Sequence, residues 1–497
     1  MRSRTKLIVY SAAGLLGAAA VATPMVANAA AQAPGKVYNV AAFGAVGDGV
    51  ANDAPAIDKA IAAASKAGGG TVTFPIGTFA VRGTTHLQSN VTINVPSGTT
   101  LTGSASGYDA PESNPNDDFQ DFGHSHFRNA MFYGNNVSNV TFTGGGTIDG
   151  GGHLITGNPK SGQADKIISI TNCKALTLSN ITLRRGGHFA ALINGCDGVK
   201  SDRLIIRTAS DRDGWNIINT SNVTITNIDD QANDDALVFK SDWALGKRFT
   251  NQGHVRVTHA KLSAGCCNAL MFGSETCSDF TDYVFDDITI TGANKSGIGM
   301  VSMDSARITD VHYRNIRMSG VSSPIMMKIG TRNRCGDHRG VGSISNITFD
   351  NITGTGKSSP QYSPTIWGET GTHHVSNVTL NNVKITVPGD HDSMGTGVPS
   401  NNAKDYNPKS IGTRPAYGWY IHNADHITFN GGGVDFGRGD GRPAVIANAA
   451  SAIKFTGFAF ERSEGSNDFV FQDVAGYCVR TAGGTPRVSA SGSSQAC

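Results

Sequence analysis

The sequence predicts an all-β protein that folds as a right-handed parallel β-helix, with one short helix closing its N-terminal end. Three observations lead to this prediction: a strand-like string recurs along the chain, its residues alternate between apolar and polar, and glycine is abundant. The chain has 62 glycines among 497 residues, well above the usual share of roughly 7%. Lys and Arg number 41 against 39 Asp and Glu, and this near-neutral charge argues against a nucleic-acid partner.

The first segment of the chain is typical of a secretory signal. Basic residues precede a mostly apolar stretch from Leu7 to Val26, and Ala27-Asn28-Ala29 matches the small-x-small rule for cleavage. A membrane anchor is the alternative, which the small residues and Pro24 disfavour. We therefore predict a signal peptide over residues 1–29 and a single secreted, monomeric β-helix domain over residues 30–497, with no membrane partner.

A helix is predicted just before the repeats. Residues 54–67 favour an amphipathic helix, with Asp53 as its N-cap and Gly68 as its end. Its apolar face consists of Ile57, Ala60, Ile61 and Ala64. Because repeat architectures need capped ends, we expect this helix to cover the first coil.

The repeated string sets the register of the predicted coils. It begins as LTLSNITL at residues 176–183 and returns seven times. A spacing of 23 residues or more indicates a constant coil with loop insertions. Short strands that stack about 4.8 Å apart form a parallel β-helix, whereas an antiparallel sandwich would show regular hairpin signals. The fifth residues of the eight strings are Asn180, Arg203, Asn227, His259, Asp287, Asn315, Asn351 and Asn382.

The cysteines and one polar segment complete the outline of the fold. Cys173 and Cys196 are 23 residues apart, so they should lie in adjacent coils as a disulfide or as stacked thiols. No C-x-x-C pair points to structural zinc, and we predict neither a metal nor a cofactor. The strand-poor segment from Asp390 to Arg414 predicts a long surface loop. Further bridges are suggested among Cys266, Cys267 and Cys277, and between Cys478 and Cys497.

Three aspartates in consecutive coils form the strongest chemical pattern. Asp213 precedes Asp234 by about one coil, and Asp235 follows directly. Adjacent residues point to opposite faces of a strand, so both acids can line one cleft only at a strand edge or a bulge. Crowded carboxyl groups favour one protonated member beside ionised ones, which is the pairing that glycoside hydrolysis requires. Turn capping and calcium binding are the alternatives.

Ordered motifs resemble those of a known family. The opening of the chain is similar to the pectate-lyase-like superfamily, and later strings resemble glycoside hydrolase family 28, the polygalacturonases. The segments that carry this resemblance are residues 38–49, 68–75, Gly144–Gly150 (family G-x-G-x-I-D-G), Arg212–Gly214 (N-T-D-G), Asn233–Ala236 (G-D-D-C) and Gly273–Glu275 (G-S-E).

The resemblance implies a secreted, inverting glycosidase that acts without a cofactor on a pectin-type or other uronic-acid-containing polysaccharide. It implies that Asp234 is the general acid and that Asp213 and Asp235 hold and activate the attacking water. Two alternatives remain open at this point: a β-helix lyase or epimerase with an Arg or Lys base, and an inactive carbohydrate-binding β-helix.

The chain departs from the family pattern at two places that concern substrate binding. The family's G-H-G histidine falls on Cys267 or Asn268, and its R-I-K string reads Met-Met-Lys with only Lys328 retained. Plain polygalacturonan is therefore disfavoured as the substrate. Arg307 and Arg332 are candidates to replace the missing arginine, or are solvated surface residues. The predicted substrate-binding residues are Lys328, Asn268, Cys267, Trp215, Arg307 and Arg332, with Trp215 either stacking on a sugar or packing in the core.

Overall fold

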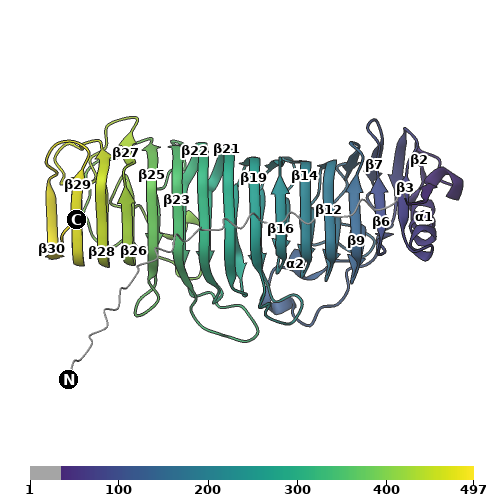
Figure 1. Ribbon diagram of the computed structural model, residues 1–497, viewed down its shortest axis with the longest axis horizontal. Coiled ribbons are helices and arrows are strands. Elements are labelled where there is room, and N and C mark those ends of the chain that lie inside the picture. The colour runs from purple at the N-terminus through teal and green to yellow at the C-terminus, as the bar shows by residue number, and fades with distance from the viewer. Residues whose placement is uncertain (1–34) are drawn as a thin grey trace, which may run out of the picture. The chain divides into compact units, whose positions relative to one another are not determined.

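A computed structural model describes residues 35–497, and the predicted signal peptide lies outside this range. The compact unit from Lys36 to Cys497 is a stack of parallel coils that begins at α1 and ends at β30 (Figure 1). The predicted parallel β-helix is confirmed. In the described part of the chain, no helix combines the length and the apolar character needed to span a membrane.

The helical elements are η1 (Val40–Phe43), α1 (Ala54–Lys66), η2 (Asp117–Phe119), α2 (Phe122–Ser125) and η3 (Pro408–Ser410). The first strands are β1 (Val37–Asn39), β2 (Asp48–Asn52), β3 (Gly70–Thr73), β4 (Thr78–Val81), β5 (Thr85–His86), β6 (Val91–Asn94), β7 (Thr100–Gly103), β8 (Ala130–Asn135), β9 (Ser138–Thr143) and β10 (Thr147–Asp149). The middle strands are β11 (Lys166–Thr171), β12 (Lys174–Arg184), β13 (Phe189–Asn194), β14 (Asp197–Thr208), β15 (Asp213–Ile218), β16 (Ser221–Thr226), β17 (Asp229–Ala232), β18 (Leu237–Ser241), β19 (Gly253–Ala264) and β20 (Leu270–Thr276). The last strands are β21 (Phe280–Ser302), β22 (Arg307–Ile329), β23 (Ser343–Gly356), β24 (Thr365–Trp367), β25 (Val375–Val387), β26 (Trp419–Asn430), β27 (Gly433–Phe436), β28 (Val445–Phe460), β29 (Phe469–Thr481) and β30 (Val488–Ser494).

The predicted register is also the observed one. Leu176 of β12 pairs with Val199 of β14, which pairs with Val223 of β16, and the same column continues to β25. The fifth residue of every string has a positive φ, from 49° at Asn180 to 56° at His259. Asn, Asp and His tolerate this left-handed conformation better than most residues, so their recurrence marks the corner of each coil.

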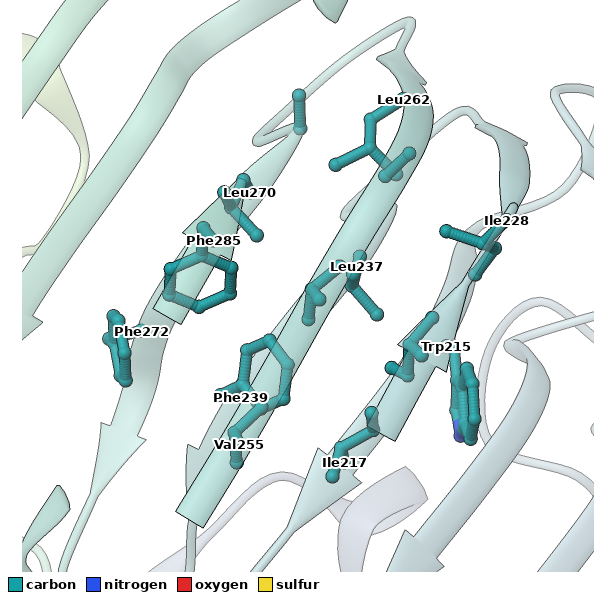
Figure 2. Packing of buried hydrophobic residues seen from close by; sticks show 14 of the residues in the cluster. Trp215, Ile217, Ile228, Leu237, Phe239, Val255, Leu262, Leu270, Phe272 and Phe285 are labelled. Carbon is teal, nitrogen blue, oxygen red and sulfur yellow. The ribbon is translucent and has the colours of Figure 1, made fainter. Parts of the chain in front are cut away.

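The core is a continuous column of apolar side chains inside the coils. Figure 2 shows part of this column, from Trp215 and Ile217 on β15 to Phe272 on β20. Aromatic rings also stack between coils: the ring centroids of Phe285 and Tyr313 are 5.0 Å apart, and those of Tyr313 and Phe349 are 4.9 Å apart. This core holds in place the coils whose outer surface carries Asp213, Asp234 and Asp235.

The N-terminal helix α1 is confirmed with an apolar face buried as predicted. Asp53 is the N-cap residue, as predicted, but its carboxylate makes no capping hydrogen bond to the helix. It accepts instead from the backbone N–H groups of Val46 at 2.7 Å and Ala80 at 3.2 Å. Asp53 therefore joins the helix start to the first coils. Gly68 follows the helix with φ 91°, as expected of a residue that ends one.

The structure resolves the alternatives for the cysteines. Cys173 and Cys196 form a disulfide between adjacent coils, and Cys478 is bonded to Cys497 at the last strands. Cys277 pairs with the distant Cys335, and Cys266 pairs with Cys267 rather than with Cys277. All eight cysteines are thus in disulfides, which is typical of proteins from oxidising compartments.

Candidate active site

One cleft of about 430 Å³ gathers the three predicted acids, and we call it the acid cleft. Its floor comes from consecutive coils at β15, β18 and β20, and its sides come from α2 and from loops between strands. The lining residues are Asp121, Phe122, Gly123, His124, Asn158, His188, Arg212, Asp213, Asp234, Asp235, Lys240, Ser274, Glu275, Arg332, Arg334, Lys404, Asp405 and Tyr406.

The backbone brings the three aspartates together at an irregular strand edge, as the sequence predicts. Asp213 is the first residue of β15, while Asp234 and Asp235 lie in the bend between β17 and β18. The N–H of Gly214 donates to the carbonyl of Asp235 at 2.8 Å, so Asp235 lies beside Asp213 in the next coil. The bend allows both Asp234 and Asp235 to line the same cleft despite their adjacency.

A buried lysine that the sequence analysis missed lies between the carboxylates. Lys240 Nζ is 3.8 Å from Asp213 Oδ2, 3.9 Å from Asp235 Oδ2 and 3.5 Å from Glu275 Oε2. It also lies 3.1 Å from His124 Nε2. Lys240 therefore places a buried positive charge beside these three carboxylates. A lysine within the apolar strand β18 carries no motif or spacing by which the sequence could have revealed this role.

Burial and charge set the proton affinities in the cleft. Burial raises the pKa of Asp213 well above its usual value, although Lys240 opposes this change. Burial and the adjacent Asp234 carboxylate raise the pKa of Asp235. Burial acts in the same direction on Glu275, but Lys240 and His124 outweigh it and hold the pKa of Glu275 well below the usual range. Burial would lower the pKa of Lys240, yet Glu275 and the aspartates raise it above its ordinary value.

Histidines line the cleft without carrying charge at neutral pH. Burial lowers the pKa of His124 to about 4, and Lys240 adds to this effect. Burial, with Arg212 as the next cause, lowers the pKa of His188 well below its usual value. The His188 ring stacks on Phe189 with centroids 4.2 Å apart. His188 thus belongs both to the cleft and to the packing beneath it.

The adjacent carboxylates of Asp234 and Asp235 have different hydrogen-bond partners. Arg212 occupies the place of the family's threonine and donates from Nε at 3.2 Å and from Nη2 at 3.0 Å to Asp234 Oδ2. Asn268 is fully buried and donates from its backbone N–H at 3.1 Å and from Nδ2 at 2.7 Å to Asp235 Oδ1. The structure therefore places Asn268 behind Asp235, not on the cleft wall where a substrate would touch it.

Other predicted binding residues lie away from the cleft surface. Trp215 is 0% exposed and packs in the core (Figure 2), so its predicted stacking on a sugar is wrong. Cys267 is buried, and its Sγ lies within 4.8 Å of ligand atoms of Cys266 and Asp234. Arg307 is exposed at the start of β22 and does not line the cleft.

The predicted cations have partners that limit their roles. Lys328 is fully buried outside the acid cleft, so it cannot contact a substrate there. Arg332 does line the cleft, and it donates from Nε to Asp304 Oδ1 at 2.9 Å and from Nη2 to the Ser274 carbonyl at 2.7 Å. The neighbouring Arg334 donates to Glu275 Oε1 at 2.7 Å.

Two groups in or beside the cleft have ligand atoms close enough for a metal ion. One is Asp121, His124 and Glu275, and the other is Asp234 with the disulfide pair Cys266 and Cys267. In the first group, Lys240 already lies 3.5 Å from Glu275 and 3.1 Å from His124. Disulfide sulfurs are not thiolates, so the second group lacks the ligands that metals prefer. Neither group is a strong metal site.

Comparison with known proteins identifies the family of the chain. Residues 75–404 match the family model described as glycosyl hydrolases family 28. The chain belongs to this family. It is therefore a glycosyl hydrolase, and the resemblance seen in its motifs is confirmed.

Individual relatives of family 28 are distant in sequence. The chain is 24% identical over 351 residues to a polygalacturonase from Malus domestica, covering 66% of this chain and 71% of that protein. It is 26% identical over 277 residues to an endo-polygalacturonase from Pectobacterium carotovorum subsp. carotovorum, covering 52% of this chain and 65% of the relative. The solved family 28 exopolygalacturonase of Yersinia enterocolitica has the same fold, with a TM-score of 0.60, 16% identity, and coverage of 88% of this chain and 77% of that one.

Replacing Asn268 by Ala is expected to lower kcat by about 10- to 100-fold and to leave KM nearly unchanged. The variant removes one of two donors to the Asp235 carboxylate, and a hydrogen bond to a charged group contributes about 1.5–3 kcal/mol. Steady-state kinetics checks this expectation. Asn448→Ala is the control, because Asn448 donates to Gln472 at 3.0 Å, away from the cleft. An equal loss in both variants, or a rise in KM alone, would contradict the positioning role of Asn268.

Proposed function

We propose that the protein is a secreted enzyme that hydrolyses a pectin-type, uronic-acid-containing polysaccharide with inversion at the anomeric carbon. The observation that carries this proposal is the grouping of Asp213, Asp234 and Asp235 around one cleft, with Lys240 buried between two of them. Family membership and the pectin-degrading relatives support the substrate class. The disulfides support secretion.

Exposure suggests how the three aspartates divide the reaction. Asp234 has the most exposed side chain of the three, at 18%, against 4% for Asp213 and 7% for Asp235. We assign to Asp234 the protonation of the leaving oxygen, because it is the acid most accessible to a bound glycan. Asp213 and Asp235 then accept the proton of the attacking water. Lys240, whose Nζ lies 3.8 Å from Asp213 and 3.9 Å from Asp235, favours the ionised form that this step requires.

The reaction follows from this division of roles. Water held by Asp213 and Asp235 attacks the anomeric carbon while Asp234 gives a proton to the departing sugar oxygen. The bond to the leaving sugar breaks as the bond to water forms on the opposite face, so the configuration inverts. One proton of the water passes to the basic pair and the other stays on the new anomeric hydroxyl; exchange with solvent then returns a proton to Asp234 and removes the extra one from the pair. Lys240 stabilises the negative charge of the pair between turnovers.

The loop from Asp390 to Arg414 supports attack at chain ends. The sequence predicts a surface loop here, but Lys404, Asp405 and Tyr406 line the acid cleft. Lys328 anchors this part of the loop. Its Nζ is 2.7 Å from Asn401 Oδ1, 2.9 Å from the Asn402 carbonyl, 2.8 Å from the Asp405 carbonyl and 2.7 Å from Ser410 Oγ. A wall of this kind restricts a long polymer more than it restricts a chain end. We therefore propose exo action.

Turnover of a polysaccharide panel tests the proposed function. The panel holds polygalacturonate, substituted pectic polymers and a neutral β-glucan, and both reducing ends and the ultraviolet absorbance of unsaturated sugars are followed. Reducing ends without absorbance are expected on at least one uronic-acid polymer. Rising absorbance would identify a lyase instead, and hydrolysis of neutral polymers alone would contradict the substrate class.

Replacing Lys328 by Met is expected to shift the products from monomers toward longer oligosaccharides. The substitution removes the four polar contacts that hold the loop, and Met fills the same space with an apolar side chain of similar length. Product sizes from the uronic-acid polymer that proves active in the panel, separated by chromatography, measure the effect. Lys454→Met is the control, because Lys454 lies on β28 outside the cleft lining. An unchanged product pattern with normal folding would show that the loop does not set the mode of attack.

A further inference from the structure

A second hollow, of about 260 Å³, lies under the other end of the same loop, and it shares no lining residue with the acid cleft. We call it the Arg414 hollow. Four of its residues are basic or histidine, and no Asp or Glu is among the described residues that line it. Its lining residues are Gln361, Tyr362, Ser363, His391, Lys409, Ile411, Gly412, Thr413, Arg414 and Arg442.

Arg414 is a buried cation whose partners are all neutral. It is 1% exposed, and it donates from Nε to Thr365 Oγ1 at 3.1 Å and from Nη1 to the Ile411 carbonyl at 2.8 Å. Its Nη2 has no hydrogen-bond partner, and among residues 35–497 no carboxylate lies within ion-pair distance of it. Its guanidinium lies 5.3 Å from the ring centroid of Tyr362. Burial lowers the pKa of Arg414 to about 9.

The surroundings do not neutralise this charge. Arg442, the other buried arginine of the hollow, is satisfied by Asp440, at 2.9 Å from Nε and 2.7 Å from Nη2. Its Nη1 donates to the Arg414 carbonyl at 3.0 Å, which holds the two segments together. Lys409 adds an exposed positive charge to the lining. Lys328 of β22, which holds the same loop from below, likewise has only neutral hydrogen-bond partners.

A buried charge without a counter-charge is costly, and proteins rarely keep one unless it binds something. A guanidinium suits oxyanions, because its fork of N–H donors matches the two oxygens of a carboxylate or sulfate. We propose that the Arg414 hollow binds an oxyanion, and that its source is the carboxylate of a uronic-acid unit. The oxyanion chemistry stands on the hollow itself, whereas the uronate source rests on the proposed function.

Binding measured on Asp234→Asn protein, which should not turn over substrate, tests the site. Galacturonate, its neutral methyl ester and inorganic sulfate are titrated at constant ionic strength, and the thermal midpoint and calorimetric affinity are recorded. The same titrations use Asp234→Asn combined with Arg414→Met. We expect galacturonate to bind at two sites, the acid cleft and the Arg414 hollow. Arg414→Met should weaken binding at the hollow by at least tenfold. The neutral methyl ester should bind the hollow no more tightly than galacturonate binds it in the Arg414→Met variant.

The outcomes separate a binding role of Arg414 from a structural one. If Arg414→Met lowers the midpoint equally at every anion concentration and leaves all affinities unchanged, Arg414 is structural and the proposal is wrong. If sulfate, but not galacturonate, binds in an Arg414-dependent way, the oxyanion site stands and the uronate source is wrong. Neither result depends on turnover by the wild-type enzyme, which tests the proposed function separately.

A second variant keeps the test informative if Arg414→Met does not fold. Lys409 is exposed, so Lys409→Gln is expected to weaken anion binding by a few-fold without changing the midpoint in anion-free buffer. Arg203→Gln is the matched control, because Arg203 is 64% exposed on β14 and pairs with Asp202. Equal anion affinities in Lys409→Gln and Arg203→Gln would overturn the proposal.

Discussion

Replacing Asp234 by Asn is expected to lower kcat by about 10²- to 10⁴-fold, the usual contribution of general acid catalysis. Asn has nearly the shape of Asp but cannot give a proton to the leaving oxygen. Substrate affinity should change little. The folded state should persist, because Asp234 is partly exposed and its main partner, Arg212, is itself partly exposed. Reducing-end kinetics on the active polysaccharide, with the thermal midpoint recorded alongside, measures both quantities.

Asp229→Asn is the matched control for this prediction. Asp229 belongs to the same coil and also pairs with an arginine, Arg207, at 2.8 Å, but it does not line the acid cleft. This control should retain nearly full activity. If Asp234→Asn keeps more than a tenth of wild-type kcat, or if both variants lose activity equally, Asp234 is not the proton donor.

Replacing Lys240 by Met is expected to have the second large effect, on activity and on stability together. The change leaves Asp213, Asp235 and Glu275 buried without their shared cation. Removing one partner of a buried ion pair typically costs about 3–5 kcal/mol. Activity should fall as well, because Lys240 fixes the charge of the pair that activates water. Urea unfolding and steady-state kinetics at neutral pH measure the two losses.

The stability loss in Lys240→Met should depend on pH. Lys240 is the main charge that lowers the pKa of Glu275, so Glu275 stabilises the fold above its unfolded pKa, about 4.3. That contribution disappears as the pH falls through the lowered folded pKa. The difference between wild type and Lys240→Met should therefore be largest near neutrality and shrink in acid. Lys240→Arg, which keeps the charge, should regain part of the stability. A difference that grows in acid would contradict this electrostatic role.

The fold could be predicted because its constraints are local and repeated. Each coil turns through residues in the left-handed region, and at one such corner Asn, Asp or His recurs, as at Asn180, His259 and Asp287. The strands between these corners alternate apolar and polar residues because one face packs in the core. Such signals are visible in a single sequence. The side-chain role of Asp53 was not, because it depends on backbone N–H groups from other coils.

The candidate site could be predicted only in part. The three aspartates carry a motif and a spacing, so their convergence was foreseeable. Lys240 was missed because a lysine within an apolar strand has no spacing that distinguishes it from a surface residue. Trp215 is predicted to bind substrate because aromatic rings stack on sugars, and Lys328 because it matches the family's R-I-K string, but burial depends on the orientation of each strand. Only the structure shows that the first packs in the core and the second anchors a loop.

The packing of the long loop could not be predicted from the sequence either. Its polar, strand-poor composition correctly predicts irregular structure between Asp390 and Arg414. Composition contains no information on where such a segment packs. The structure brings Tyr406 of this loop to the acid cleft and buries Arg414 beneath its other end. Both the proposed exo action and the proposed oxyanion site follow from that placement.

The anomeric form of the first product is the most direct test of the proposed mechanism. Proton NMR of the wild-type reaction on an α-linked uronic-acid oligosaccharide, recorded before mutarotation, identifies that form. Water activated by Asp213 and Asp235 on the face opposite the leaving group predicts that the β anomer appears first. Initial formation of the α anomer would require a covalent intermediate on one of the carboxylates, and it would contradict the roles assigned to all three aspartates.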